Sequence, residues 1–132
     1  MDLNLITDYT NIKKFSLNNH ICNSKIIKVY DGDSITAIFE YNNVLYKWNC
    51  RLTGIDTPEL KTKDENEKNL AIIARDALQE KILNKIVKLH CYDFDKYGRL
   101  LVDIYLEELH INKWLITEKY ANIYDGKTKT KW

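Results

Sequence analysis

Several short stretches of the chain alternate between apolar and polar residues, which is the pattern of β-strands with one buried face. The alternation is strict from Val44 to Thr53, where Trp48 lies on the apolar face and Arg51 on the polar face. Together these runs predict five strands, over 24–30, 34–40, 44–53, 86–92 and 100–106. The short loop at Asn42-Asn43 joins two of them, so the first three strands form a meander.

A different period, close to that of an α-helix, follows the meander. Asp64, with Glu67 three residues on, fits a helix start, and Asn84 fits its end. The apolar stripe of this helix comprises Leu70, Ile73, Ala74, Ala77, Leu78 and Ile82. A second, short helix is predicted around Ile111, Trp114 and Leu115.

Residues 1–23 show no clean period, although Leu5, Tyr9, Ile12 and Phe15 fit an apolar helical stripe. We expect an N-terminal appendage over 1–23 and one folded domain over 24–132. Three strands, a helix, two strands and a helix suit a five-stranded β-barrel of the oligonucleotide/oligosaccharide-binding (OB) type. An open α+β sheet fits the same elements. The expected core comprises Ile26 or Ile27, Ile35, Phe39, Trp48, Leu52, Leu78, Leu89, Val102 and Ile104.

Composition narrows the class of protein. The 132 residues are 45% hydrophobic and carry a net charge of +1, so the chain should fold, and any anionic ligand must be held by a local site. The three cysteines are far apart and predict buried free thiols rather than a disulfide or a zinc site. The N-terminus lacks a signal-peptide pattern and no segment has the length of a membrane span, so we expect a cytoplasmic protein. The lysines of 127–131 are read as an exposed tail.

The stretch from Cys50 to Glu59 concentrates charged groups on stiff backbone. If the strand continued straight, Asp56 would point away from Arg51, and Gly54 supplies a place for the chain to bend. Pro58 restricts the backbone on both sides of itself and makes a rigid corner. A guanidinium beside two carboxylates suits a phosphate and a cation. The alternative is a strand end with a solvated ion pair.

Two turns complete the pattern: Asp31-Gly32-Asp33-Ser34 and Asp95-Lys96-Tyr97-Gly98-Arg99. In this order, with the segment 51–59 and a helix between, they closely resemble the staphylococcal nuclease family over about residues 24–124. The resemblance implies a five-stranded barrel and a calcium-dependent phosphodiesterase that acts on DNA and RNA. Two departures stand out: Lys119 replaces a glycine after the second helix, and the chain leaves little room for a third helix after Tyr124.

The resemblance also implies roles for individual residues. Asp33, Asp56 and the backbone carbonyl of Thr57 match calcium ligands. Arg51 and Arg99 match the phosphate-binding arginines, and Glu59 matches the glutamate that abstracts a proton from water or orders it. Substrate contacts are expected from Lys96, Tyr97 and Tyr124.

Carboxylate and carbonyl oxygens suit Ca²⁺, and three protein ligands leave positions for water and a phosphate oxygen. We expect a monomer with little sequence specificity that prefers single-stranded or frayed nucleic acid. The resemblance implies cleavage that leaves 3′-phosphate ends. A non-catalytic nucleic-acid or protein-binding module is the competing interpretation, because the same barrel serves for binding. The unmatched N-terminus leaves a third, an interaction domain of a larger assembly. The intact set of acids and arginines favours the enzyme.

Overall fold

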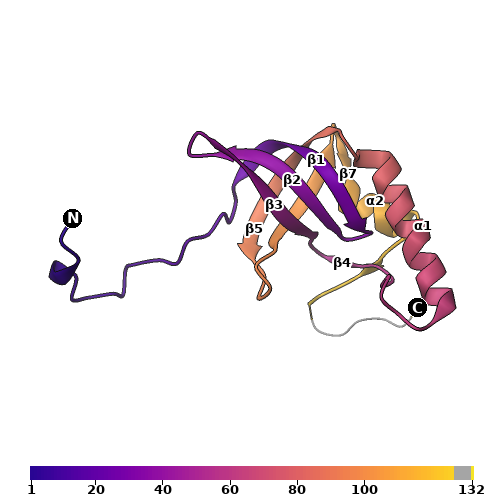
Figure 1. Ribbon diagram of the computed structural model, residues 1–132, viewed down its shortest axis with the longest axis horizontal. Coiled ribbons are helices and arrows are strands. Elements are labelled where there is room, and N and C mark those ends of the chain that lie inside the picture. The colour runs from indigo at the N-terminus through magenta and orange to yellow at the C-terminus, as the bar shows by residue number, and fades with distance from the viewer. Residues whose placement is uncertain (127–131) are drawn as a thin grey trace.

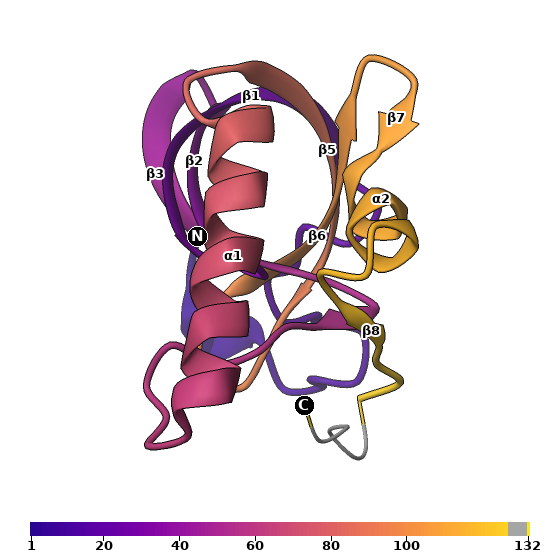
Figure 2. The same cartoon turned by 90° about the vertical axis from the view of Figure 1, so that its right-hand side faces the viewer.

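Five long strands wind into a barrel in the computed structural model, which describes residues 1–126 and 132 (Figures 1 and 2). They are β1 (Ile21–Asp31), β2 (Ser34–Tyr41), β3 (Val44–Leu52), β5 (Ile86–Phe94) and β6 (Leu100–Leu106). Shorter elements are a 3-10 turn (Leu3–Leu5), β4 (Ile55–Asp56), β7 (Leu109–His110) and β8 (Asn122–Ile123). The helices are α1 (Glu65–Ile82) and α2 (Ile111–Thr117). The predicted lysine tail at 127–131 lies outside the described residues.

The strand order is β3-β2-β1-β5-β6, and β3 also pairs with β6. That last pairing is parallel and runs from Cys50 opposite Leu100 to Leu52 opposite Val102, whereas the other long strands pair antiparallel. It joins the two ends of the sheet, so the five strands close on themselves. This confirms the predicted OB-type barrel, and the open sheet is wrong.

The barrel interior holds the residues that alternation assigned to it. Apart from Trp48, the predicted core side chains are buried in one cluster, and of the pair Ile26 and Ile27 it is Ile26 that belongs to it. Trp48 is half-buried and lies flat on Phe39, with ring centroids 4.5 Å apart. Cys50 and Cys91 are buried thiols, and Cys22 is a half-buried one.

Helix α1 packs along the barrel (Figure 2). Its buried face is narrower than its sequence indicated. Asp64 caps its first turn, since its carboxylate accepts the backbone N–H of Asn66 at 2.9 Å. Its buried residues are Ala71, Ala74, Leu78 and Ile82. The predicted burial of Leu70 and Ile73 is wrong, because they are 37% and 53% exposed. Alanines at the contact let the helix approach closely, which turns the larger neighbours outward.

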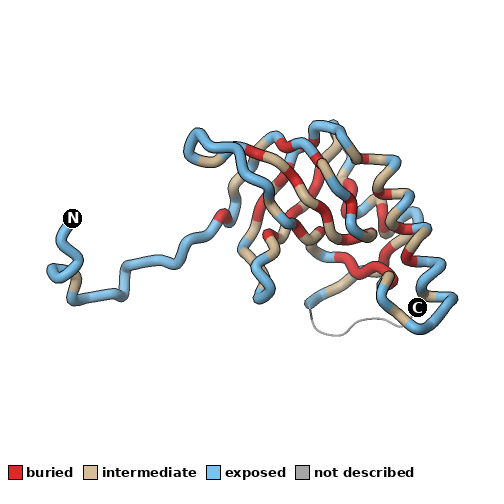
Figure 3. The backbone as a smooth tube through the Cα atoms, viewed as in Figure 1, coloured by how far each residue is buried: buried red, intermediate tan, exposed pale blue. Residues whose placement is uncertain are grey.

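The N-terminal segment extends away from the barrel and is almost wholly exposed up to position 16 (Figures 1 and 3). The predicted helical stripe is wrong, because this segment contains only the 3-10 turn at Leu3–Leu5. Contact with the barrel begins at Phe15, whose ring lies 5.7 Å from that of Tyr41, and Leu17 is the first buried residue. Strand β1 starts at Ile21 rather than at Ser24. Among the described residues, no helix is both long and apolar enough to cross a membrane.

Lys119 occupies the glycine position after α2 and keeps the backbone that a glycine favours. Its φ is 65°, the N–H of Lys119 bonds to the carbonyl of Ile116, and the N–H of Tyr120 bonds to that of Leu115. These two bonds form a Schellman cap around a left-handed residue.

We expect Lys119→Gly to raise the free energy of unfolding by about 1 kcal/mol, because it removes the Cβ clash of this conformation. Urea denaturation measures the change, and Glu118→Gly, at the neighbouring non-left-handed position, should give no gain.

Candidate active site

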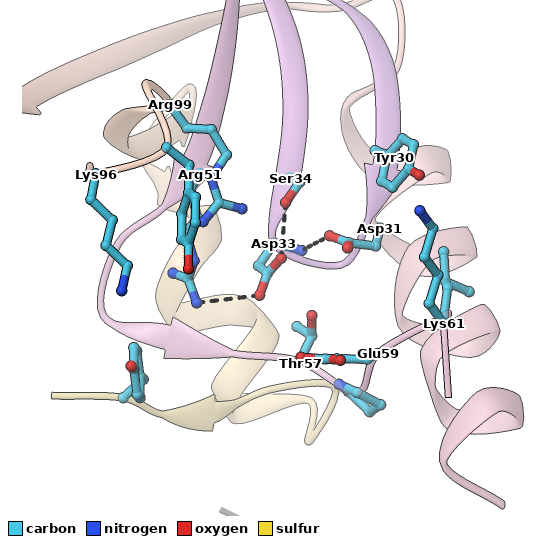
Figure 4. A pocket seen from close by; sticks show the side chains of 14 residues that line it. Tyr30, Asp31, Asp33, Ser34, Arg51, Thr57, Glu59, Lys61, Lys96 and Arg99 are labelled. Carbon is cyan, nitrogen blue, oxygen red and sulfur yellow. Dashed lines mark hydrogen bonds and ion pairs between the residues drawn. The ribbon is translucent and has the colours of Figure 1, made fainter. Parts of the chain in front are cut away.

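A cleft of about 500 Å³ opens where the β1–β2 turn, the β3–β4 corner and the β5–β6 hairpin meet (Figure 4). Of the nine predicted site residues, eight line it: Asp33, Arg51, Thr57, Glu59, Lys96, Tyr97, Arg99 and Tyr124. They come from segments that are far apart in the chain. The geometry therefore brings together groups that the sequence could only place on separate turns.

The β1–β2 turn presents two carboxylates to the cleft. The backbone N–H of Asp33 donates to Asp31 at 3.1 Å, and the hydroxyl of Ser34 donates to Asp33 at 3.1 Å. Gly32 makes this turn possible, because a Cβ there would lie 2.8 Å from Cγ2 of Thr57 and 3.1 Å from Cβ of Ala74. The turn thus sits directly against the residue that follows Asp56 and against helix α1.

Asp31 is a site residue to which the sequence assigned no role. Burial, followed by a hydrogen bond and repulsion from Asp33, raises the pKa of Asp31 to about 7. A cation bound beside Asp31 would favour its ionised form, because the positive charge offsets the cost of burial and the repulsion from Asp33. The Asp-Gly-Asp turn was the available signal, because such a turn can direct both acids to one side.

Arg51 is held in place by backbone carbonyls as well as by charge. One of its terminal nitrogens donates to the carbonyl of Leu52 at 2.8 Å; the other donates to the carbonyl of Ile55 at 3.1 Å and to Asp33 at 3.4 Å. The bend predicted at Gly54 is present, with φ of 78°. The side chain is only 11% exposed, so its guanidinium is oriented before any ligand arrives.

Arg99 reaches the cleft from the tip of the β5–β6 hairpin. The carboxylate of Asp95 accepts the backbone N–H groups of Tyr97 and Arg99, both at 2.9 Å, and the Nε–H of Arg99 at 2.8 Å. Burial opposes ionisation of Asp95, but these hydrogen bonds outweigh it and lower the pKa of that carboxyl group. The guanidinium of Arg99 and the ammonium of Lys96 lie 5.5 Å and 5.2 Å from the ring centroid of Tyr97.

The Pro58–Glu59 corner is anchored to helix α1. The backbone N–H of Glu59 donates to the carboxylate of Glu67 at 3.0 Å, while the Glu59 side chain is exposed at the edge of the cleft (Figure 4). Pro58 itself is buried. Glu67 is a second residue to which the sequence assigns no role in the site, because its position three residues after Asp64 indicates only a helix start.

Only some of the calcium ligands implied by the resemblance lie in the cleft. Asp33 and Thr57 line the cleft, whereas Asp56 is 1% exposed on β4, which pairs with β8, and does not line it. Within the described part of the chain, no three His, Cys, Asp or Glu side chains converge to hold a metal ion. The oxygens of Asp33 and Thr57, with Asp31 alongside, fit a hard cation such as Ca²⁺ that retains water ligands. The roles of Asp33, Asp56 and Thr57 as ligands stay a prediction.

Comparison with known families decides the class of the chain. A family model described as staphylococcal nuclease homologue matches residues 49–131, more than half of the sequence. The chain belongs to this family. The match contains Arg51, Glu59 and Arg99 and begins after Asp33, whose place in the site rests on the geometry.

The chain is also similar to several individual proteins. A probable staphylococcal-like nuclease of Oryza sativa subsp. japonica, CAN3, is 37% identical over 75 residues, which cover 57% of this chain and 18% of that protein. An uncharacterized protein of Methanocaldococcus jannaschii is 28% identical over a match that covers 93% of this chain and 69% of that protein. An uncharacterized endonuclease of Haemophilus influenzae is 26% identical over a match that covers 91% of this chain and 61% of that protein. The chain spans about a fifth of the length of the first rice relatives it matches.

Proposed function

We propose that the protein is a calcium-dependent nuclease that hydrolyses phosphodiester bonds of DNA and RNA. One observation carries the proposal: two arginines, a buried aspartate and an exposed glutamate line a single cleft, although they come from three separate segments. Family membership supports the same reaction class. The relatives named above as nucleases or endonucleases are consistent with it.

The arginines supply the binding of the scissile phosphate. A guanidinium matches the geometry of a phosphate with two parallel N–H donors and stays charged at any working pH. Carbonyl groups fix Arg51, and the Asp95 carboxylate fixes Arg99, so little conformational freedom is lost when a phosphate binds. Both charges also stabilise the extra negative charge that develops as the phosphate is attacked.

Asp33 and the carbonyl of Thr57, which line the cleft, are proposed to hold calcium together with Asp56, which is buried directly before Thr57 in the chain. When bound there, the ion supplies charge neutralisation at the phosphate. Asp33 already bonds to Arg51, so the same carboxylate faces both the proposed cation site and the phosphate-binding guanidinium. Three ligands from the chain leave room for a phosphate oxygen.

Glu59 is proposed to activate the attacking water, either by accepting its proton or by orienting it. Its carboxylate is exposed and lines the cleft, so water and substrate can reach it. Pro58 stiffens the corner, and Glu67 holds the backbone N–H of Glu59. This support keeps the carboxylate at a defined distance from the phosphate site.

We further propose little sequence specificity, a preference for single-stranded or frayed substrates, 3′-phosphate products and a monomeric enzyme. The site is built around phosphate chemistry, and phosphate contacts carry no sequence information. The near-neutral net charge gives no general attraction to duplex DNA.

The decisive experiment is digestion of single-stranded DNA, duplex DNA and RNA with Ca²⁺, with Mg²⁺ and with excess chelator, followed by analysis of the new ends. We expect cleavage with Ca²⁺, poor cleavage with Mg²⁺ because the smaller ion demands octahedral geometry, and 3′-phosphate ends. Full activity in chelator refutes the metal assignment. 5′-Phosphate ends refute the cleavage direction, and binding without cleavage identifies a binding module.

Glu67 offers a test of how the corner is positioned. Glu67→Ala removes the acceptor for the Glu59 N–H and should lower kcat about 10-fold, equivalent to about 1.4 kcal/mol, with little change in KM. Glu67→Gln keeps an acceptor oxygen and should restore most of the rate. Steady-state kinetics at saturating calcium measure both. Equal losses in the two variants would show that the hydrogen bond does not position Glu59.

A further inference from the structure

A second hollow adjoins the cleft on the outer face of the meander. It encloses about 420 Å³, and its own lining includes Lys28, Thr36 and Asn49. It shares Tyr30, Asp31, Ser34 and Arg99 with the cleft, so the two form one continuous surface. A nucleic-acid strand that leaves the phosphate site in this direction would run along β1, β2 and β3.

Strand register explains why polar side chains follow one another here. Residues that pair across neighbouring strands form rows on this face. In the first row Ser34 lies opposite Arg51, and in the next row, two residues further along β2, Thr36 lies opposite both Lys28 and Asn49. The hydroxyl of Thr36 donates to the side-chain oxygen of Asn49 at 3.1 Å, which fixes that row. Successive rows are about 7 Å apart, comparable to the distance between neighbouring phosphates of an extended single strand.

Positive charge continues along the rows. In the next row Ile38 lies opposite both Lys25 and Lys47, and these lysines and Lys28 are exposed. The ion pairs within the described residues involve none of the three. Negative charge on this face is confined to its two ends, with Asp31 at the cleft and Glu40 near the hairpin tip.

An aromatic ring lies where the rows meet the cleft. Tyr30 is 51% exposed, and the ammonium group of Lys28 is 5.4 Å from its ring centroid. Figure 4 shows Tyr30 on the Asp31 side of the cleft, away from Arg51 and Arg99. Exposed aromatic rings beside positive charge are the means by which proteins bind single strands without reading sequence.

We propose that this face is a strand track, formed by Lys25, Lys28, Tyr30, Lys47 and Asn49, that binds the single-stranded nucleic acid continuing from the phosphate between Arg51 and Arg99. The direction of the strand rests on the function proposed for that phosphate site. The lysines contact backbone phosphates and Tyr30 stacks on a base. Affinity therefore increases with oligonucleotide length until the track is filled.

The test compares two triple variants of equal charge. The track variant is Lys25→Gln, Lys28→Gln and Lys47→Gln, and the control is Lys68→Gln, Lys85→Gln and Lys113→Gln, on exposed positions elsewhere. Binding of a labelled single strand of about 12 nucleotides is measured by anisotropy in chelator, over a range of salt. We expect the track variant to bind about 10- to 100-fold more weakly in about 0.1 M salt, with the salt slope smaller by about 2. The control should bind within about 3-fold of the wild type, because only long-range charge is lost.

Kinetics separate the track from the chemistry. With calcium, the track variant should show a higher KM for the long strand and an unchanged kcat/KM for a dinucleotide. The single variant Lys28→Gln gives a smaller shift of the same kind if the triple variant does not fold. Equal weakening in both triple variants, or no weakening in either, overturns the strand track. If the wild type binds but never cleaves and the track variant loses binding, the track stands while the proposed nuclease function fails.

Discussion

Glu59→Gln should lower the rate of phosphodiester cleavage by about 10²–10⁴-fold while leaving the fold and substrate binding intact. Glutamine keeps the volume and much of the hydrogen bonding of the side chain but cannot accept a proton. The side chain is exposed at the rim of the cleft, so its replacement should change stability by no more than about 0.5 kcal/mol. Arg51 and Arg99 remain available to hold the phosphate.

The measurement pairs digestion rate with melting temperature at one calcium concentration. Glu108→Gln, an exposed carboxylate in the turn between β6 and β7, is the matched control and should change neither quantity. An unchanged rate in Glu59→Gln would remove this residue from the mechanism. A rate loss that follows unfolding would assign Glu59 a structural role instead.

Asp33→Asn should abolish calcium-dependent cleavage, because it neutralises the carboxylate that lines the cleft and bonds to Arg51. Calcium binding can be followed without activity. At calcium of about 100 times its Kd, the wild type gains about 2.7 kcal/mol of stability, and the variant should gain little. The amide retains the size of the side chain, so the fold should persist without calcium.

Thermal unfolding with and without calcium gives the second readout for Asp33. Asp76→Asn, on the exposed surface of α1, serves as control and should keep the stabilisation by calcium. A variant at position 33 that is still stabilised as strongly as the wild type would place the ion elsewhere. Retained stabilisation with lost cleavage would make Asp33 a phosphate-site residue rather than a calcium ligand.

Local rules predicted most of the elements. The alternation of β3 placed Arg51 on the polar face. Helix α1 begins after the Asp64 cap and ends before Asn84, whose φ is 63°, as expected. The same rules wrongly predicted that Leu70 and Ile73 are buried. Helical spacing indicates that an apolar stripe exists but not which of two neighbouring stripes packs against the barrel. Small residues decided that choice through close packing against the β1–β2 turn.

Sequence motifs predicted the site residues that lie within a single motif. The prediction was incomplete where residues from two separate segments meet. Arg51, Arg99 and Glu59 lie in recognisable turns and line the cleft. The sequence indicates only a helix start at Glu67, yet the carboxylate of Glu67 accepts the backbone N–H of Glu59. Asp31 acquires its raised pKa from burial beside Asp33, and that burial depends on tertiary packing. The Glu67 contact has no signature in local sequence, and the Asp31-Gly32-Asp33 turn indicates that two acids lie together but not that one of them is buried.

The parallel pairing of β3 with β6 joins Cys50 to Leu100, and it ties the strand that carries Arg51 to the strand that follows Arg99. A contact between residues so distant in sequence carries a large loop-closure cost and is expected to form late in folding. The two guanidinium groups that are proposed to bind phosphate are therefore separated in any intermediate that has formed only the meander. In a refolding experiment, recovery of phosphate binding should report closure of the barrel, later than the return of β-structure.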